Sequence, residues 1–355
     1  MTLQLDDYRL LGRSGLRVSP LSLGTMTFGA GHGWGSTDAD AARIIDTYLD
    51  RGGNFIDTAN FYGQTGGSEI LLGQLLADRR ERLVLATKYT LTMRPGDPNA
   101  SGNHRKNMLR SVEASLRRLN TDHIDLLYLH MWDFRTPVEE ILRAFDDLVR
   151  QGKILYAGLS DTPAWQCSRM QAIADLRGWS PFAALQISYS LIERTVEREL
   201  IPMAREMGMG VIPWSPLGGG VLSGKYTLED LRGSQTSDAT SRRTMNNATG
   251  RLSETNLAIA TVVTEIAQEI GRTPAQAALA WTLLNPAVVS PIIGARTPAQ
   301  LEDNLGALDV TFTEHQIGRL NEANSVKLGF PHDFLDGPNA QMLFGGVRVA
   351  RPIRG

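Results

Sequence analysis

Four side chains that can move or orient a proton follow three successive apolar runs of the sequence. Asp57 ends the run NFID, Tyr62 comes five residues later, Lys88 ends LVLATK and His130 ends IDLLYLH. A tyrosine has a pKa of about 10, so alone it is a weak acid at neutral pH. A neighbouring ammonium favours the phenolate, so we expect Lys88 to lower the pKa of Tyr62. With Asp57 holding Lys88 and His130 orienting a substrate oxygen, the residues predict proton donation to a carbonyl while hydride arrives at carbon.

Each of these residues also has an ordinary structural explanation. An aspartate after a strand often caps the next turn, and a tyrosine before glycine is often a surface aromatic. A lysine at a strand end commonly points into solvent, and a single histidine is usually a satisfied polar residue. The catalytic interpretation therefore depends on all four residues meeting at one place in the fold.

The elements that carry these residues alternate between short apolar runs and longer amphipathic runs, as in a parallel sheet covered by helices. Residues 8–11 and 16–18 flank Gly12-Arg13-Ser14-Gly15 and predict a hairpin. Eight strands follow, the number that closes a (β/α)8 TIM barrel, whose active sites lie at the carboxyl ends of the strands. We expect strands at 21–24, 54–57, 83–88, 124–130, 154–160, 183–188, 210–214 and 288–293, and helices at 38–51, 68–77, 106–119, 137–151, 163–176, 196–207, 254–270, 274–284 and 298–305.

The chain is expected to be one domain over residues 1–355, with the barrel at about 8–324 and a Gly/Pro-rich tail at 325–355. Residues 215–252 form a long polar connection after the seventh strand, and connections of this length are usually functional or disordered. Four Thr-Pro pairs predict helix starts, with the threonine as the capping residue and the proline in the first turn. These pairs are Thr136-Pro137, Thr162-Pro163, Thr273-Pro274 and Thr297-Pro298.

Composition limits the possible partners. The 355 residues are 42% hydrophobic and 21% charged, with a net charge of −2 and no dense basic stripe, which argues against nucleic acid. Cys167 is the only cysteine, so we expect no intramolecular disulfide and no thiolate metal site. No basic segment with an apolar run opens the chain, and no run of about 18 apolar residues is present. We therefore expect a cytoplasmic enzyme with no membrane partner.

Several segments, taken together, resemble the aldo-keto reductase superfamily. They are NFIDTANFYGQTGGSEILLG, the ends of LVLATK and LYLH, GLSD, the strand around Gln186, IPWSPLGGGVLSGKY and PIIGARTPAQLEDNL, and they run in family order from about residue 8 to 324. The chain most resembles the long bacterial-type members, a branch that includes the potassium-channel β-subunits. The resemblance places the family's catalytic tetrad at Asp57, Tyr62, Lys88 and His130. It implies hydride transfer from C4 of a nicotinamide, proton donation by Tyr62, and no metal.

No strand-turn-helix GxGxxG is present, which argues against a Rossmann site but not against a nicotinamide cofactor. The resemblance implies an extended NADPH across the barrel mouth, with NADH as an alternative. Trp214 should stack on the nicotinamide, Lys225 should add a charge at the pyrophosphate, and Arg296 should pair with a 2′-phosphate. Asp161 departs from the commoner asparagine, so we expect altered nicotinamide contacts. The expected cofactor-binding residues are Gly24, Thr25, Met26, Asp57, Ser160, Asp161, Gln186, Trp214, Ser215, Pro216, Leu217, Gly219, Lys225, Gly294, Arg296, Gln300, Asp303 and Asn304.

The substrate pocket is expected to be built from loop aromatics, with Phe28, Trp34, Tyr89 and Trp132 as its wall. Aromatic walls suit a fairly large apolar carbonyl compound. The leading hypothesis is NADPH-dependent reduction of an aldehyde or ketone to an alcohol. Two alternatives stay open: an NAD(P)-dependent alcohol or sugar dehydrogenase working in the oxidative direction, and a cofactor-bound regulatory subunit.

Overall fold

The structure is a computed structural model that describes residues 3–29, 35–232, 242–335 and 338–347. Its centre is an eight-stranded parallel sheet in the order β10-β3-β4-β5-β6-β7-β8-β9. An isolated parallel bridge between Val211 and Val288 brings the two edges together, so the sheet forms a nearly closed barrel, as predicted. Its strands are β3 (Ser22–Gly24), β4 (Phe55–Asp57), β5 (Val84–Tyr89), β6 (Ile124–Leu129), β7 (Ile154–Ser160), β8 (Phe182–Ser188), β9 (Gly210–Trp214) and β10 (Ile292–Gly294).

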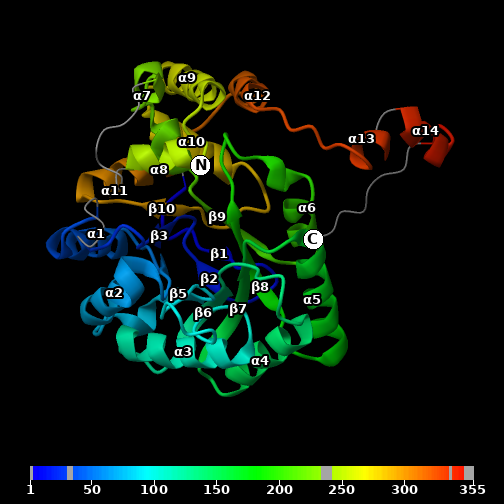
Figure 1. Cartoon of the computed structure of the whole chain (residues 1–355). Coiled ribbons are helices and arrows are strands. Elements are labelled where there is room, and N and C mark those ends of the chain that lie inside the picture. The colour runs from blue at the N-terminus through cyan, green and yellow to red at the C-terminus, as the bar shows by residue number, and fades with distance from the viewer. Residues whose placement is uncertain (1–2, 30–34, 233–241, 336–337, 348–355) are drawn as a thin grey trace.

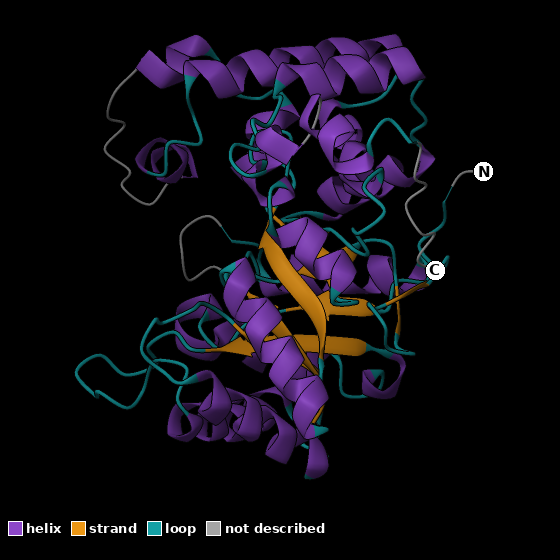
Figure 2. Ribbon diagram, turned by 90° about the vertical axis from the view of Figure 1, so that its right-hand side faces the viewer, coloured by secondary structure: helices purple, strands orange, loops and turns teal. Residues whose placement is uncertain are grey.

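Helices surround the barrel on the outside (Figure 1), and the view from the side shows the strands enclosed by them (Figure 2). The strands are buried on both faces, which explains their continuous apolar sequences. The surrounding helices are α1 (Asp38–Asp50), α2 (Tyr62–Leu75), α3 (Arg105–Leu119), α4 (Val138–Arg150), α5 (Ala164–Arg177), α6 (Leu200–Glu206), α9 (Glu254–Glu269), α10 (Pro274–Leu283) and α11 (Pro298–Leu305).

The predicted hairpin closes one end of the barrel. Its strands are β1 (Arg9–Leu10) and β2 (Arg17–Val18), and they pair antiparallel. Leu11 and Val18 join the buried cluster formed by the inward-facing strand residues. Because Gly12 packs against the backbone at the beginnings of β8 and β9, the hairpin covers the amino ends of the strands. The carboxyl ends therefore form the open mouth.

Several predicted boundaries are wrong, for local reasons. The last strand covers only Ile292–Gly294 rather than 288–293, because Val288 makes only the isolated bridge to β9. Residues 195–197 form a 3-10 turn, and α6 begins only at Leu200. Helix α2 is assigned from Tyr62, but residues 63–66 have positive φ, so its regular part begins near residue 68, as predicted.

The Thr-Pro prediction is confirmed at two helices and wrong at two. Thr273 and Thr297 cap α10 and α11 by accepting from the amides of Gln276 and Gln300. At α4 and α5 the proline itself occupies the capping position, so no side chain caps the helix. The hydroxyl of Thr136 donates to Asp133, and that of Thr162 donates to the Ser160 carbonyl.

The connection after β9 is not structureless in its described part. It contains a 3-10 segment at Gly218–Ser223, then α7 (Leu228–Arg232) and α8 (Arg242–Ala248). After α11 the chain forms a further helix that the sequence did not predict, α12 (Glu314–Ala323). Two short helices, α13 (His332–Leu335) and α14 (Pro338–Phe344), then project away from the barrel (Figure 1).

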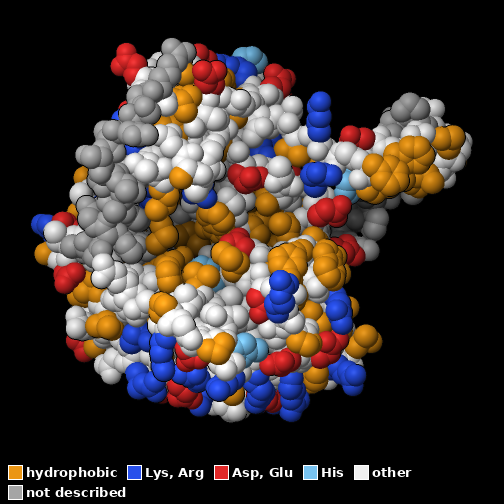
Figure 3. Space-filling model, in the orientation of Figure 1, with side chains coloured by type: hydrophobic (Ala, Val, Ile, Leu, Met, Phe, Trp, Pro, Cys, Tyr) orange, Lys and Arg blue, Asp and Glu red, His pale blue; other side chains and the backbone are white. Residues whose placement is uncertain are grey.

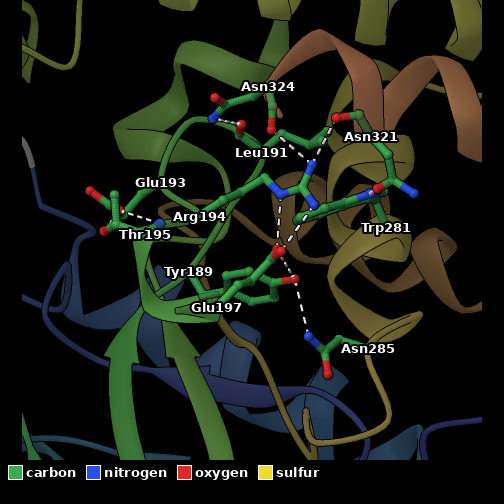
Figure 4. A network of polar contacts seen from close by, with 10 residues as sticks. All are labelled: Tyr189, Leu191, Glu193, Arg194, Thr195, Glu197, Trp281, Asn285, Asn321 and Asn324. Carbon is green, nitrogen blue, oxygen red and sulfur yellow. Dashed lines mark hydrogen bonds and ion pairs between the residues drawn. The ribbon is translucent and has the colours of Figure 1, made fainter. Parts of the chain in front are cut away.

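A polar network joins α12 to the loop after β8 (Figure 4). Arg194 donates to both carboxylate oxygens of Glu197 and to the carbonyls of Asn321 and Asn324. Its guanidinium carbon lies 5.1 Å from the centroid of the Trp281 ring. A groove of about 550 Å³ beside this network is lined by α6, α10 and α12, so it lies outside the barrel.

Within the described ranges, no helix combines the length and the apolar character needed to cross a bilayer.

Candidate active site

The strand register brings the four predicted catalytic residues to one end of the barrel. Asp57 is the last residue of β4, Lys88 lies near the end of β5, and His130 directly follows β6. These three strands are neighbours, with Asp57 paired to Ala86. Tyr62 begins α2, so the short β4–α2 loop places it beside the same strand ends.

Lys88 and Asp57 form a buried ion pair. The Lys88 ammonium lies 2.5 Å from Oδ1 of Asp57 and also donates to the carbonyl of Thr58 at 2.7 Å. The other carboxylate oxygen, Oδ2, accepts from Nε2 of Gln186 at 2.8 Å. Burial alone would lower the pKa of Lys88, but Asp57 and Tyr62 outweigh it and raise the pKa. Lys88 therefore stays an ammonium.

Tyr62 lies beside this ammonium. The Lys88 nitrogen is 5.0 Å from the centroid of the Tyr62 ring. Burial raises the pKa of Tyr62, and the opposing effect of Lys88 is too small to reverse it. The expectation that Lys88 lowers the pKa of Tyr62 below its usual value is therefore wrong. The sequence does not show how completely the phenol is removed from water, and this burial decides the direction of the shift. The phenol stays protonated at neutral pH, which suits a proton donor.

His130 completes the cluster as a neutral imidazole. Its ring meets that of Tyr62 edge to face, with centroids 5.9 Å apart and an interplanar angle of 82°. Burial and the nearby Lys88 lower the pKa of His130 to about 3. Its Nδ1 is buried and has no hydrogen-bond partner among the described residues. A neutral imidazole in this position can donate a hydrogen bond to an oxygen next to Tyr62.

The residues expected at the nicotinamide lie at the same strand ends. The hydroxyl of Ser160 is buried without a hydrogen-bond partner in the described part of the chain, so it is available to a ligand. Asp161 instead accepts from Nε1 of Trp214 at 2.9 Å. Gln186, another expected cofactor residue, donates from its amide nitrogen to Asp57. Gln186 thus holds the ion pair.

The glycines after β9 create close backbone approaches. Gly218, Gly219 and Gly220 all have positive φ, between 57° and 91°, which favours glycine. A Cβ atom on Gly219 would lie 2.3 Å from Oδ1 of Asn246, and one on Gly220 would lie 2.8 Å from the Lys225 nitrogen. Such glycine-lined backbone next to a lysine is typical of phosphate sites.

Four cations gather beside these glycines. The pKa of Lys225 is lowered by burial and by Arg296 and Arg242, and that of Arg242 is lowered by burial and by Arg251 and Arg296. Within the described ranges, Lys225, Arg251 and Arg296 form no ion pair closer than 4 Å. The sequence predicted Lys225 and Arg296. The sequence analysis did not single out Arg242 and Arg251. Both lie in the polar connection 215–252, and their positive charge is the signal that could have identified them.

The expected adenosine end is only partly free. The amide of Arg296 donates to the side chain of Gln300, and Asn304 donates to the carbonyl of Gly294. Asp303 accepts from the Thr273 hydroxyl and from Gln276, so it is tied to α10. The other expected cofactor contacts lie at the ends of β3 and β9. At the end of β3, Met26 is exposed, whereas Gly24 and Thr25 are buried. After β9, Ser215 has a positive φ and is followed by Pro216 and Leu217.

The expected substrate wall is not assembled as predicted. Tyr89 is fully buried, donates to the carbonyl of Asn103 and packs against Phe145, so it belongs to the helical layer. Phe28 is also buried in the core, and Trp34 lies outside the described residues. Trp132 is mostly buried and meets the more exposed Phe134 edge to face.

Other apolar side chains after the strand ends are exposed instead. Met26 follows β3, Phe61 follows β4, and Met131 and Phe134 follow β6. Over the barrel strands the surface is hollowed, and hydrophobic side chains gather around the hollow (Figure 3). The sequence did not single out Phe61 or Phe134, because strand periodicity does not say which loop side chains stay uncovered.

The described residues contain no group of three or more His, Cys, Asp or Glu side chains arranged to hold a metal ion. Cys167 is buried, and burial raises the pKa of its thiol to about 12.

A barrel with a buried lysine–carboxylate pair, a tyrosine and a neutral imidazole at its open end has the parts of an oxidoreductase that pairs proton and hydride transfer. The model of the aldo/keto reductase family matches residues 20–325. The chain therefore belongs to the aldo/keto reductase family and is an oxidoreductase.

Curated relatives agree with this assignment. A norsolorinic acid reductase of Aspergillus flavus is 40% identical over 344 residues, covering 93% of this chain and 84% of the relative. An uncharacterized oxidoreductase, YrpG, of Bacillus subtilis is 40% identical over 328 residues, covering 89% and 95%. A putative aryl-alcohol dehydrogenase, AAD14, of Saccharomyces cerevisiae is 36% identical over 345 residues, covering 94% and 90%.

Proposed function

We propose that this protein reduces an aldehyde or ketone to an alcohol with NADPH, and that Tyr62 gives the proton. The observation that carries the proposal is the contact of Lys88 with both Asp57 and the Tyr62 ring, beside a neutral His130. In this arrangement the phenol, the ammonium and the imidazole can act on one oxygen atom. Reduction of a carbonyl also needs a hydride donor, because Tyr62 supplies only a proton.

A nicotinamide dinucleotide fits the residues around the mouth. The unpartnered Ser160 hydroxyl at the end of β7 can bind a carboxamide, and Trp214 offers an aromatic ring at the end of β9. The glycine segment 218–220 and Lys225 suit a pyrophosphate. Arg296, together with the cations near Lys225, suits the 2′-phosphate of NADPH. The cluster of positive charges thus favours NADPH over NADH.

When bound, the nicotinamide supplies a hydride from C4 to the carbonyl carbon. His130 donates a hydrogen bond that orients the carbonyl oxygen towards Tyr62. Tyr62 gives its proton to that oxygen, and Lys88 stabilises the phenolate that is left. Asp57 and Gln186 keep Lys88 charged and in place throughout.

The protonation state of Tyr62 suits the reductive direction of a reversible reaction. Reduction needs a phenol, and burial keeps the Tyr62 pKa above its usual value. Relatives named norsolorinic acid reductase support reduction, whereas relatives named aryl-alcohol dehydrogenase support oxidation. An intact four-residue site favours catalysis over a purely regulatory role. The exposed apolar side chains at Met26, Phe61 and Phe134, with the aryl-alcohol relatives, favour an aromatic carbonyl substrate.

The experiment is a panel of aromatic and aliphatic aldehydes and ketones, followed by the loss of NADPH absorbance and repeated with NADH. We expect turnover of aromatic carbonyls with NADPH and a lower kcat/KM with NADH. Tight NADPH binding without turnover of any carbonyl, and without oxidation of the matching alcohols by NADP⁺, would support a regulatory subunit and contradict this proposal.

A further inference from the structure

Asp161 is a carboxylate at the carboxyl ends of the barrel strands, beside residues that we propose to bind the cofactor. It directly follows Ser160, the last residue of β7. Its backbone amide donates to the carbonyl of Gln186, and its own carbonyl accepts from the amide of Trp132. With φ of 42°, it has the left-handed conformation that aspartate and asparagine tolerate better than most residues. The side chain is therefore held firmly.

The carboxylate has one neutral partner and no ion pair closer than 4 Å within the described ranges. Oδ1 accepts from Nε1 of Trp214 at 2.9 Å. Burial raises the pKa of Asp161, while Trp214 and the Lys88 ammonium oppose this. Asp161 in turn raises the pKa of Tyr62, so its charge is felt at the proton donor. The guanidinium carbon of Arg251 lies 5.3 Å from the ring centroid of Trp214, the partner of Asp161.

We propose that the charge of Asp161 sets the balance between the two redox forms of the bound cofactor, by stabilising the oxidised form. This inference rests on the proposed use of a nicotinamide dinucleotide. An oxidised nicotinamide ring carries a positive charge, whereas the reduced ring is neutral. A dinucleotide that works with Tyr62 brings its nicotinamide to the strand ends where Asp161 and Trp214 lie. The carboxylate then attracts the oxidised ring and has no comparable effect on the reduced one.

Coulomb interactions make this effect large enough to measure. Two unit charges several ångströms apart at a partly buried site change an equilibrium constant by roughly tenfold. An asparagine at this position would offer the same acceptor oxygen without the charge. The aspartate therefore moves the equilibrium on the enzyme towards the oxidised cofactor, and so towards the carbonyl-forming direction compared with an asparagine protein.

The test is direct binding of NADP⁺ and NADPH to the wild type and to Asp161→Asn, measured by calorimetry at pH 8 without substrate. Asparagine keeps the oxygen that accepts from Trp214, so the change removes mainly charge. Asp175→Asn is the matched control, since Asp175 pairs with Arg13 on the hairpin side of the barrel. We expect the Kd for NADP⁺ to rise about fivefold or more in Asp161→Asn, with the Kd for NADPH little changed and both values unchanged in the control.

Each other outcome counts against the inference. Equal weakening of NADP⁺ and NADPH binding would show that Asp161 only positions the cofactor. Unchanged Kd values for both forms would show that its charge does not act on the nicotinamide. If the asparagine variant does not give the wild-type circular dichroism spectrum, Asp161→Ser replaces it in the same titrations. Failure of the wild type to bind either dinucleotide would instead overturn the proposed function, and this inference with it.

Discussion

The ammonium of Lys88 lies 2.5 Å from the carboxylate of Asp57, and both side chains are almost completely buried. Gln186 donates a hydrogen bond to the second carboxylate oxygen of Asp57, and the Thr58 carbonyl accepts a hydrogen bond from Lys88. Two charges removed from water in this way stabilise each other only while both are present. The ion pair therefore matters both for the stability of the folded protein and for the proposed proton transfer.

Breaking this pair from one side should destabilise the protein. Asp57→Asn leaves a buried ammonium, and Lys88→Met leaves a buried carboxylate, so each should lower the free energy of unfolding by ~3–5 kcal/mol. The double variant removes both charges and should recover part of that loss, while turnover stays abolished. Urea unfolding and steady-state rates of all three variants check this. A double variant destabilised by the sum of the two single losses would contradict the coupling.

Tyr62→Phe removes the proton donor and leaves the ring that packs beside Lys88 and His130. We expect kcat to fall by roughly 10²-fold or more, because general acid catalysis typically contributes that much. NADPH binding should be retained, since the phenol is not among the proposed cofactor contacts. Tyr8→Phe, which removes an exposed hydroxyl bound to the Gly52 carbonyl, is the matched control. If Tyr62→Phe kept most of the wild-type turnover, another group would have to be the acid.

The sequence was sufficient to predict the barrel and the meeting of the four residues that we propose to be catalytic. Apolar runs buried on both faces mark the strands, and the residue that ends each run must lie at the mouth. Asp57, Lys88 and His130 follow directly from this rule. The rule fails at residue 288, which makes only a single bridge to β9. Strand pairing there depends on the neighbouring strand, which the local sequence does not show.

Side-chain partners were harder to predict than strand ends. Gln186 was predicted to bind the cofactor, and its hydrogen bond to Asp57 was not predicted. Tyr89 follows the catalytic Lys88 directly, so alternation along the strand turns it towards the helices rather than the mouth. The surroundings of Arg242 and Arg251 depend on how the connection after β9 folds back over the barrel. The hydrophobic periodicity of the sequence does not predict the path of that connection.

His130 should make the stability of the protein depend on pH. Its pKa is about 3 in the folded chain and about 6.5 in the unfolded chain, so between these values only the unfolded chain binds the proton. Stability should therefore fall as the pH falls from about 6.5 towards 3, by at most about 1.4 kcal/mol per pH unit from this residue. His130→Asn should show a shallower slope than the wild type in urea unfolding at pH 7.0, 6.0 and 5.0. Parallel slopes would mean that His130 is readily protonated in the folded protein.

The cations beside the glycine segment should select the phosphorylated dinucleotide. Arg296 forms no ion pair within the described part of the chain, and it raises the local positive potential felt by Lys225. Arg296→Ala should therefore weaken NADPH binding by roughly tenfold or more, as loss of a charge-assisted contact predicts, and NADH binding much less. Arg169→Ala, which removes a surface arginine paired with Glu139, is the control for net charge. Equal losses for NADPH and NADH would place the effect of Arg296 at the pyrophosphate, and unchanged affinities would exclude Arg296 from the cofactor site.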